Sequence, residues 1–298
     1  MISVNLPTDL LRAFVTVVDL GSYTRAGEVL GRTQPAVSLQ IRRLEELVDA
    51  KLIDTVGKRP SLTNQGEMLS VYARQILSLN DEAVAQFSKR ADLSRLRVGL
   101  PTDYAVTFLQ NLLTRFCEQH PDVELDITCD LSHALLDSLR EDELDIVVAM
   151  TSESVSQYLA RAWVERPIWV VAKNSGVFKM TPVRLVAHPE GCEYRNRMIE
   201  ALNAEQRPWR VVYCSPGISG VQTAVSSGMG VSALTKRTLK QDMRILTESD
   251  GFPTLSTIRV GLYYKHPRQT SSGLLLINYL IAQLDQANEP DFRRLKYS

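Results

Sequence analysis

The chain has 298 residues, which is enough for two or three structural units rather than one small core. Its 34 lysines and arginines balance 34 aspartates and glutamates, which excludes a uniformly basic protein, so any contact with nucleic acid must be local. The four cysteines are widely spaced without a CxxC pair, which argues against a zinc site and against the disulfide framework of a secreted protein.

The first predicted helix follows Thr8, a suitable cap, and ends at Gly21. Asp9, Arg12 and Asp19 interrupt its apolar run, which argues against a signal peptide. No later window reaches the roughly 18 uninterrupted apolar residues that a membrane span needs, so we expect a cytoplasmic protein without membrane contact. The core-facing positions of this helix recur at helical spacing: Leu10, Leu11, Phe14, Val17 and Val18.

Two more helices are predicted before residue 50. The second covers residues 24–30 with Ser22 as its cap, and Gly31 ends it. We expect its core-facing residues to be Ala26, Val29 and Leu30. The third follows the cap Thr33, and Pro35 is tolerated in its first turn because an amide there has no partner within the helix. Its predicted buried stripe contains Ala36, Val37, Ile41, Leu44 and Leu47.

The other face of the third helix is polar. It carries Gln34, Ser38, Arg42 and Glu45 at helical spacing. Glutamine can bond adenine edges, arginine can bind guanine or phosphate, and serine can reach either. Between residues 25 and 43 the basic residues outnumber the single acidic residue, Glu28. These basic residues are Arg25, Arg32, Arg42 and Arg43. A short helix, a tight turn and a helix with this face predict a DNA-binding helix-turn-helix.

Residues 51–63 are predicted to form two short strands around a turn at Gly57. Lys58 and Arg59 lie at the tip, where two cations suit a wing that touches the DNA backbone or minor groove. The alternative is that Arg42 and Arg43 only solvate a surface helix and that the tip is an ordinary turn. Helix, turn, helix and basic tip at these offsets together favour DNA binding.

The segment SYTRAGEVLGRTQPAVSLQIRRLEELVDAKLIDTVGKRPSLTNQGE, residues 22–67, resembles the winged helix-turn-helix of LysR-type transcriptional regulators. The QPAVS core, the RLE after it and the LT-x-x-G beyond the wing fall at family spacing. Three departures affect base preference: Gly27, Leu39 and Thr55. The resemblance implies a bacterial regulator that binds double-stranded DNA at an interrupted inverted repeat. The DNA-binding residues that it implies are Ser22, Arg25, Thr33, Gln34, Pro35, Ser38, Arg42, Lys58 and Arg59.

A long helix is predicted over residues 64–87, followed by a polar hinge at residues 89–95. Its apolar positions approximate heptads: Leu69, Tyr72, Ala73, Ile76, Leu79, Ala83 and Phe87. Spacing alone leaves open whether this face packs within the chain or against a partner helix. The resemblance implies a homodimer through this helix, with effector domains completing a homotetramer.

The remaining chain alternates strands and helices. Residues 96–150 read as βαβαβ, which implies parallel strands, and a second such unit follows over residues 166–234. A strand near residues 257–265 and a last helix over 272–285 then return the chain to the first of these units. The fold class is therefore α/β multidomain: a winged helix-turn-helix, a linker helix and a two-lobed effector domain like a periplasmic binding protein. The predicted limits are 1–63, 64–90 and 91–298, with lobe I at about 95–163 and 267–298 and lobe II at about 164–266.

A segment of the second lobe carries a narrower resemblance. Residues 188–234, from HPEGCEYRN at the start to GMGVSAL at the end, look like the motility and virulence regulators named for LrhA and HexA. Thr235 departs from that group, where a proline is common after the strand. This resemblance implies that the chain controls motility or virulence genes.

Open α/β sheets bind ligands at the carboxyl ends of their strands, so we expect a small-molecule effector between the lobes. Hydroxyls and free amides at helix starts suit a carboxylate or similar polar group, and no basic residue follows these strands directly, which argues against a phosphate. The alternative is that the hydroxyl residues only cap helices. The candidate effector-binding residues are Pro101, Thr102, Ser132, Thr151, Cys192 and Ser215.

Other protein classes fit less well. The four histidines are scattered and no HExxH, GxSxG, Walker or GxGxxG motif is present, so we expect no catalytic residue, cofactor or metal. Cys192 as a redox sensor is an alternative, although nothing basic lies beside it in sequence. A solute-binding or enzyme-like α/β protein would explain only the second half of the chain. We therefore expect a LysR-type regulator that responds to an effector and contacts RNA polymerase.

Overall fold

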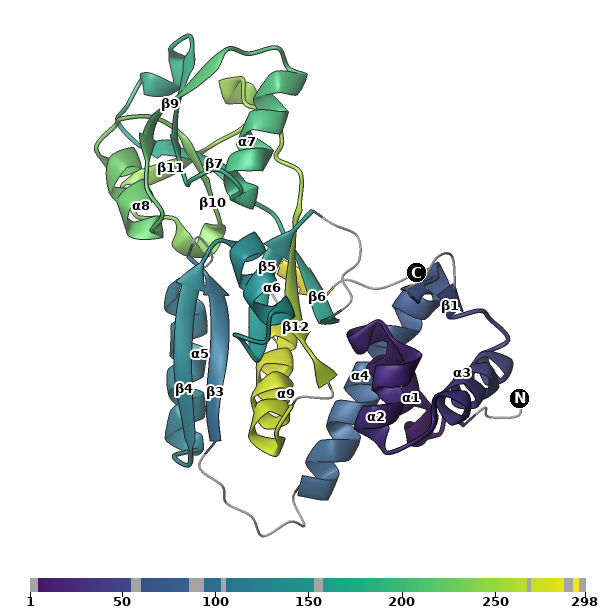
Figure 1. Ribbon diagram of the computed structural model, residues 1–298. Coiled ribbons are helices and arrows are strands. Elements are labelled where there is room, and N and C mark those ends of the chain that lie inside the picture. Colours follow the sequence, from purple (N-terminus) through teal and green to yellow (C-terminus); the bar gives the residue numbers. More distant parts are fainter. Residues whose placement is uncertain are drawn as a thin grey trace.

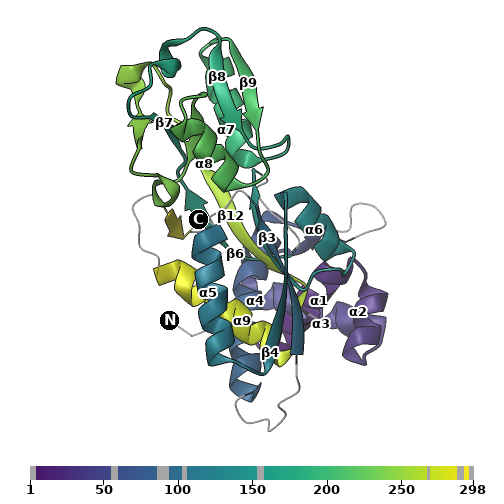
Figure 2. The same ribbon diagram turned by 90° about the vertical axis from the view of Figure 1, so that its left-hand side faces the viewer.

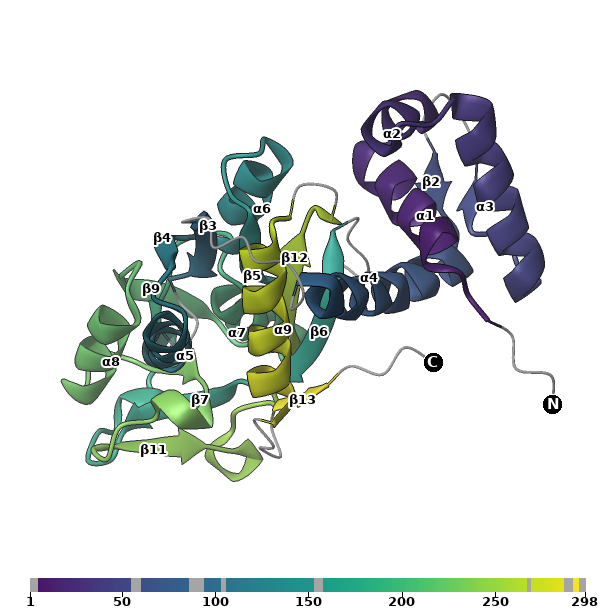
Figure 3. The same ribbon diagram turned by 90° about the horizontal axis from the view of Figure 1, so that it is seen from below.

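The computed structural model describes residues 5–54, 60–85, 94–102, 106–152, 158–266, 269–286 and 292–294. A small helical domain, a long helix and two α/β lobes follow one another along the chain (Figure 1). Seen from below, the helical domain projects from one side of the lobes, and the long helix lies between them (Figure 3). No helix in the described ranges has the length and apolar character needed to cross a membrane.

The helical domain packs three helices and a two-stranded wing around Phe14, which is fully buried. Strands β1 and β2 pair antiparallel, with Ile53 opposite Leu62. The core continues into the long helix through Ala73 and Leu77. Its elements are α1 (Thr8–Leu20), α2 (Tyr23–Leu30), α3 (Gln34–Val48), β1 (Ile53–Asp54), β2 (Ser61–Leu62) and α4 (Asn64–Ala85).

Two details of this domain differ from the sequence-based expectation. Pro7, not Thr8, occupies the capping position of α1, because Thr8 already has helical backbone geometry, and no side chain caps this helix. Val29 is 56% exposed instead of facing the core, since the short helix α2 buries only Ala26 and Gly27.

Lobe I contains a six-stranded sheet in the order β13-β6-β12-β5-β3-β4. The predicted parallel arrangement is confirmed for β3 against both β4 and β5, whereas β12 runs antiparallel between β5 and β6. The strands are β3 (Ser94–Pro101), β4 (Val123–Asp130), β5 (Ile146–Thr151), β6 (Leu159–Glu165), β12 (Ile258–Tyr264) and β13 (Phe292–Arg294). The helices of this lobe are α5 (Val106–Gln119), α6 (Ser132–Arg140) and α9 (Ser271–Gln286).

Alternate residues of the buried strand β5 supply both faces of this sheet. Val147 and Ala149 pack in the cluster beneath α6, while Ile146 and Val148 pack in the larger core with α5 and α9. The view turned about the vertical axis shows α6 on one side of the strands and α5 and α9 on the other (Figure 2). Every residue from 146 to 150 is therefore apolar and buried.

Lobe II contains two smaller sheets, which corrects the expectation of a second uniformly parallel unit. β8 and β9 are parallel, but β7 runs antiparallel to both of its neighbours, β10 and β11. Both neighbours follow β7 only after β8, α7, β9 and α8, so this sheet joins segments that are far apart in the sequence. The elements are β7 (Ile168–Ala172), β8 (Val183–Ala187), α7 (Glu193–Ala204), β9 (Trp209–Cys214), α8 (Ile218–Ser226), β10 (Ser232–Leu234) and β11 (Met243–Leu246). Three short 3-10 turns complete it: η1 (Val177–Lys179), η2 (Lys236–Thr238) and η3 (Glu248–Asp250).

Two strands cross between the lobes. β6 ends and β12 begins at the boundary with lobe II, and they pair antiparallel with Ile258 opposite Glu165. Because β12 also pairs with β5, it belongs to the sheet of lobe I, and assigning residues 258–264 to lobe II was wrong. The opposite ends of both strands reach the helical domain.

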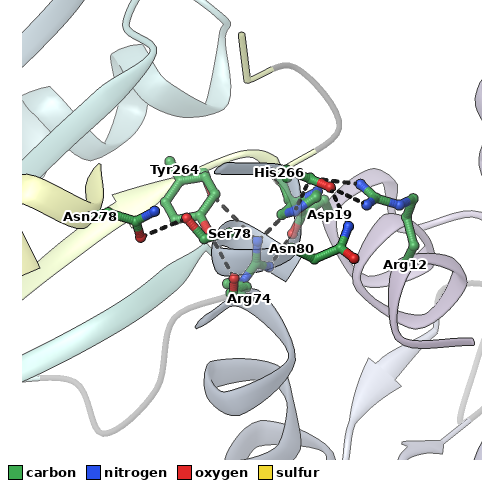
Figure 4. Close-up of polar contacts among 9 residues, drawn as sticks. Arg12, Asp19, Arg74, Ser78, Asn80, Tyr264, His266 and Asn278 are labelled. Atoms are coloured by element: carbon green, nitrogen blue, oxygen red, sulfur yellow. Dashed lines mark hydrogen bonds and ion pairs between the residues drawn. The ribbon is translucent and has the colours of Figure 1, made fainter. Parts of the chain in front are cut away.

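That junction is built around a buried ion pair between Asp19 at the end of α1 and Arg74 in the middle of α4 (Figure 4). Both side chains are completely buried. The backbone amide of His266 donates to Asp19 at 2.9 Å, and the phenol of Tyr158 donates to the Asp19 carbonyl at 3.4 Å. Arg74 also donates to the carbonyl of Tyr264 at 3.4 Å. The residues just before β6 and at the end of β12 thus hold the ion pair from the side of lobe I.

Further polar contacts extend this junction along α4. Ser78 donates to Asn278 of α9 at 2.8 Å (Figure 4). Arg12 of α1 forms a bidentate pair with Asp81 of α4, whose carboxylate lies 3.5 Å from the imidazole of His266. Burial and the nearby cations of Arg74 and Arg12 lower the pKa of His266 to about 4. The imidazole is consequently neutral at neutral pH.

Replacing Arg74 by methionine tests the junction. The Asp19 carboxylate would then be buried without its partner, so the free energy of unfolding should fall by about 3 to 5 kcal/mol. The matched control is Arg140→Met, because Arg140 pairs with Asp137 in solvent and such pairs contribute at most about 1 kcal/mol. Urea unfolding of the full-length chain, followed by circular dichroism, measures both. Equal losses in the two variants would contradict the buried ion pair.

Candidate nucleic-acid interface and interlobe region

Local interactions shape the turn between α2 and α3. The Ser22 hydroxyl accepts from the amide of Arg25 at 3.3 Å and caps α2 as predicted. Gly31 adopts a left-handed conformation with φ 63°, which ends the helix. Gly27 has a steric role, because a Cβ there would lie 2.6 Å from the Arg32 carbonyl. The glycine at this departure from the family pattern allows the turn to pass close to α2.

The start of α3 also follows the predicted local chemistry. Thr33 caps it by accepting from the amide of Ala36 at 3.4 Å, and Pro35 lies in the first turn. Gln34, Pro35 and Arg42 are exposed, whereas Ser38 is half-buried. Two of the polar positions singled out on this helix, Gln34 and Arg42, therefore lie on its solvent-facing side, with Ser38 at the edge.

The basic residues around this surface carry uncompensated charge. Arg25, Arg32, Arg42 and Arg43 are all exposed. None of the four forms a salt bridge with an acid in the described ranges, in contrast to Arg12 and Arg74 of the same domain. A cationic surface next to exposed hydrogen-bonding groups on a helix is the arrangement that binds phosphates and base edges. Lys58 and Arg59 at the predicted wing tip lie outside the described residues.

Glu45 is not on this exposed face, contrary to the sequence-based expectation. It is 8% exposed, and its carboxylate accepts from the amides of Leu52 at 2.9 Å and Ile53 at 3.4 Å. Burial alone would raise the pKa of Glu45, but the Lys51 ammonium at 2.8 Å and these amides outweigh it and lower that pKa. Glu45 thus fixes the start of the wing to the end of α3, where this side of the helix faces the core.

The candidate effector residues of lobe I gather at the strand ends near lobe II. Pro101 ends β3 and is buried, and Thr102 follows it half-buried, with its amide donating to the Asp130 carbonyl at 3.1 Å. Thr151 ends β5. Ser132 is buried at the start of α6, and its hydroxyl accepts from the amide of Met150 at 2.9 Å. Ser132 therefore joins α6 to β5 rather than capping its own helix.

The candidates of lobe II lie at two places, the start of α7 and the end of β9. Cys192 is 1% exposed at the capping position of α7. Gly191 beside it faces lobe I, since a Cβ there would lie 3.1 Å from the imidazole of His133. Ser215 follows β9, and its hydroxyl donates to the Gly217 carbonyl at 3.1 Å. The structure thus brings the Ser132 region of lobe I against the Cys192 region of lobe II, and nothing places Ser215 at this contact.

Sequence reasoning missed the residues that join the lobes directly. The phenol of Tyr194 on α7 donates to the Glu165 carboxylate at 3.1 Å, and both side chains are buried. Glu165 is an acid at the end of an apolar strand shortly before Pro167, which was the only signal in the sequence. His133 was noted only as one of four scattered histidines. Among the described residues, no three His, Cys, Asp or Glu side chains are grouped in a way that could hold a metal ion.

Comparison with known proteins agrees with this architecture. Residues 8–67 match the bacterial regulatory helix-turn-helix protein, lysR family, and residues 89–285 match the LysR substrate binding domain. The transcriptional regulator DgdR of Burkholderia cepacia is 30% identical over 89% of this chain and 90% of its own length. PecT of Dickeya dadantii, another transcriptional regulator, is 30% identical over 86% of this chain and 80% of its own.

A solved structure shows the same fold. CrgA, a LysR-type transcriptional regulator from Neisseria meningitidis, superimposes with a TM-score of 0.53 at 19% identity, covering 94% of this chain and 99% of the other. The family matches together span the helix-turn-helix and both lobes. The chain therefore belongs to the LysR family and is a DNA-binding transcriptional regulator with an effector-binding substrate domain, not an enzyme.

Proposed function

We propose that this regulator binds an interrupted inverted repeat as a homodimer, with one α3 helix in each half-site. The observation that carries the proposal is the exposed side of α3, where Gln34 and Arg42 lie beside arginines without acidic partners. A helix with such a face, following a short capped helix and a tight turn, fits the major groove. The units would be the winged helix at 1–63, the linker helix at 64–90 and the regulatory domain at 91–298.

The roles of the individual residues follow from their placement. Gln34 and Ser38 would read base edges, and Arg42 and Arg25 would bind phosphate. Ser22, Thr33 and Pro35 lie at helix starts, where free amides favour an anionic phosphate oxygen. Lys58 and Arg59 would extend the contact to the backbone or minor groove.

The dimer would form through an apolar stripe on α4. Met68, Tyr72, Ile76 and Leu79 follow one another at helical spacing and are 38%, 42%, 38% and 63% exposed. The opposite side of α4 is occupied by contacts with α1, α9 and β6. The stripe is thus left for a partner helix, and a twofold axis along it would set the distance between the two α3 helices. Regulatory domains would complete a tetramer.

The effector would bind between the lobes near Thr102, Ser132, Thr151 and Cys192. Half-buried hydroxyl and amide groups there suit a small carboxylate. Binding would change the position of lobe II, and β6 and β12 would transmit this change because they run from the lobe boundary to the junction at Asp19. The shift would alter DNA bending or the contact with RNA polymerase.

The genes controlled are also a matter of proposal. The resemblance of residues 188–234 to the LrhA and HexA group supports control of motility or virulence genes. Expression profiling of a strain without this regulator tests that assignment, which would be abandoned if no motility or virulence transcript changed.

The base-reading role predicts different losses for Gln34→Ala and Arg42→Ala. On a duplex selected from random DNA by the full-length protein, Gln34→Ala should cost about 1 to 3 kcal/mol and leave binding to unrelated DNA unchanged. Arg42→Ala should weaken binding to every sequence. It should also lower the slope of log affinity against log salt concentration by about one, because one fewer counterion is released. Gln110→Ala, at an exposed glutamine of α5, is the control. Identical losses on both DNAs for the two variants would refute the assigned roles.

The assembly proposal predicts that Leu79→Lys dissociates the dimer. A charge in the middle of an apolar helix pair is left without water or partner, so the mass from light scattering at micromolar concentration should fall from dimer or larger to monomer. Met229→Lys changes a residue of lobe II that is 47% exposed and should leave the mass unchanged. A wild-type protein that is monomeric, or a Leu79→Lys dimer, would exclude this interface.

The effector proposal is tested with a panel of small monocarboxylic acids and Thr102→Val. At least one acid should raise the melting temperature of the wild type, and the variant, which loses one hydroxyl at nearly constant volume, should lose that response. Thr114→Val, at an exposed threonine of α5, should respond like the wild type. The carboxylate assignment fails if no acid stabilises the wild type, and the role of Thr102 fails if its variant still responds.

A further inference from the structure

Leu39 occupies the centre of the exposed side of α3. It is 67% exposed, whereas Val37, Ile41 and Leu44 form the buried stripe of the same helix. With 3.6 residues per turn, Leu39 projects almost directly opposite the middle of that stripe. It therefore points further from the core than Gln34 or the half-buried Ser38.

Charged side chains flank Leu39 on this side of the helix. Arg42 and Arg43 follow it and are exposed, and Pro35 precedes it by one turn. All of α3 lies in the described ranges, and Leu39 is its one exposed large hydrophobic side chain. A single exposed leucine on a free surface needs no explanation. Here, however, the surface is the side of the helix that DNA must cover, so the side chain is desolvated when the protein binds.

The major groove offers only one apolar group to such a side chain. Base edges present nitrogen and oxygen donors and acceptors, which would lose water against an isobutyl group without gaining a hydrogen bond. Thymine alone presents a methyl group there. Contact with this methyl would bury both apolar surfaces, while the flanking arginines reach the phosphates on either side.

We propose that Leu39 is a specificity-determining residue that packs against the methyl group of one thymine in each half-site. The proposal rests on α3 being the reading helix. It adds a hydrophobic contact to the hydrogen bonds assigned to Gln34 and Ser38.

Deoxyuridine substitution tests this contact, because uracil differs from thymine only in lacking the methyl group and pairs with adenine in the same way. The probe is the duplex selected from random DNA by the full-length wild type, with each thymine replaced singly by deoxyuridine. Loss of one buried methyl should weaken wild-type binding about three- to fivefold at one thymine per half-site. The remaining replacements should change binding less than twofold.

Variants of Leu39, tested on the thymine and uracil duplexes, complete a double-mutant cycle. Leu39→Ala should weaken binding to the thymine duplex by a similar factor and should no longer distinguish thymine from uracil at that position. Leu39→Met keeps an apolar side chain of similar size and should retain the distinction. Both substitutions preserve helix propensity at an exposed site, so the melting temperature should be unchanged. Met180→Ala, at a residue of lobe II that is 50% exposed, is the control.

Several results would overturn the proposal. One is a wild type for which no single uracil replacement matters, and another is a penalty that persists unchanged in Leu39→Ala. Loss of affinity in Gln34→Ala without any uracil effect would leave the reading helix intact and refute only the role of Leu39. Failure of the wild type to select any sequence would refute the reading role of α3 itself.

Discussion

The ion pair between Asp19 and Arg74 fixes how the DNA-binding helices sit on the regulatory domain. Each charge has lost its water and is stable only opposite the other. The pair can form only where the end of α1, the middle of α4 and the end of β12 meet, because His266 and Tyr264 complete its hydrogen bonds. α1, α4 and lobe I are thereby held as one body by a contact that tolerates little displacement.

This arrangement gives α4 two distinct sides. One side is buried against α1, α9 and β6, and the other carries the exposed apolar stripe that begins at Met68. Docking of the regulatory domain and the proposed pairing with a second copy would therefore not compete for surface. The strands β6 and β12 run in opposite directions between the lobe boundary and this junction, so they connect lobe II to the body that contains α1 and α4.

The features predicted correctly from sequence are those set by local chemistry. Ser22 and Thr33 cap helices within three residues of themselves, Gly31 ends a helix by its own conformation, and apolar spacing identifies most strands. Contacts distant in sequence were not predictable. Asp19 showed only as an interruption of an apolar run, since its partners lie 55 and 247 residues away. Glu45 was wrongly predicted to be exposed, because its carboxylate accepts hydrogen bonds from backbone amides at the start of the wing that follows.

The buried junction also limits how freely this regulator can exchange parts with its relatives. Asp19 and Arg74 belong to the segment that carries DNA recognition, whereas Tyr158, Tyr264 and His266 belong to the regulatory segment. A hybrid that joins residues 1–85 to another regulatory domain would keep these bonds only if that domain places the same backbone groups and a phenol against the ion pair. Modularity in this protein therefore depends on a matched set of residues across the junction, and recombination that ignores it would separate sensing from DNA recognition.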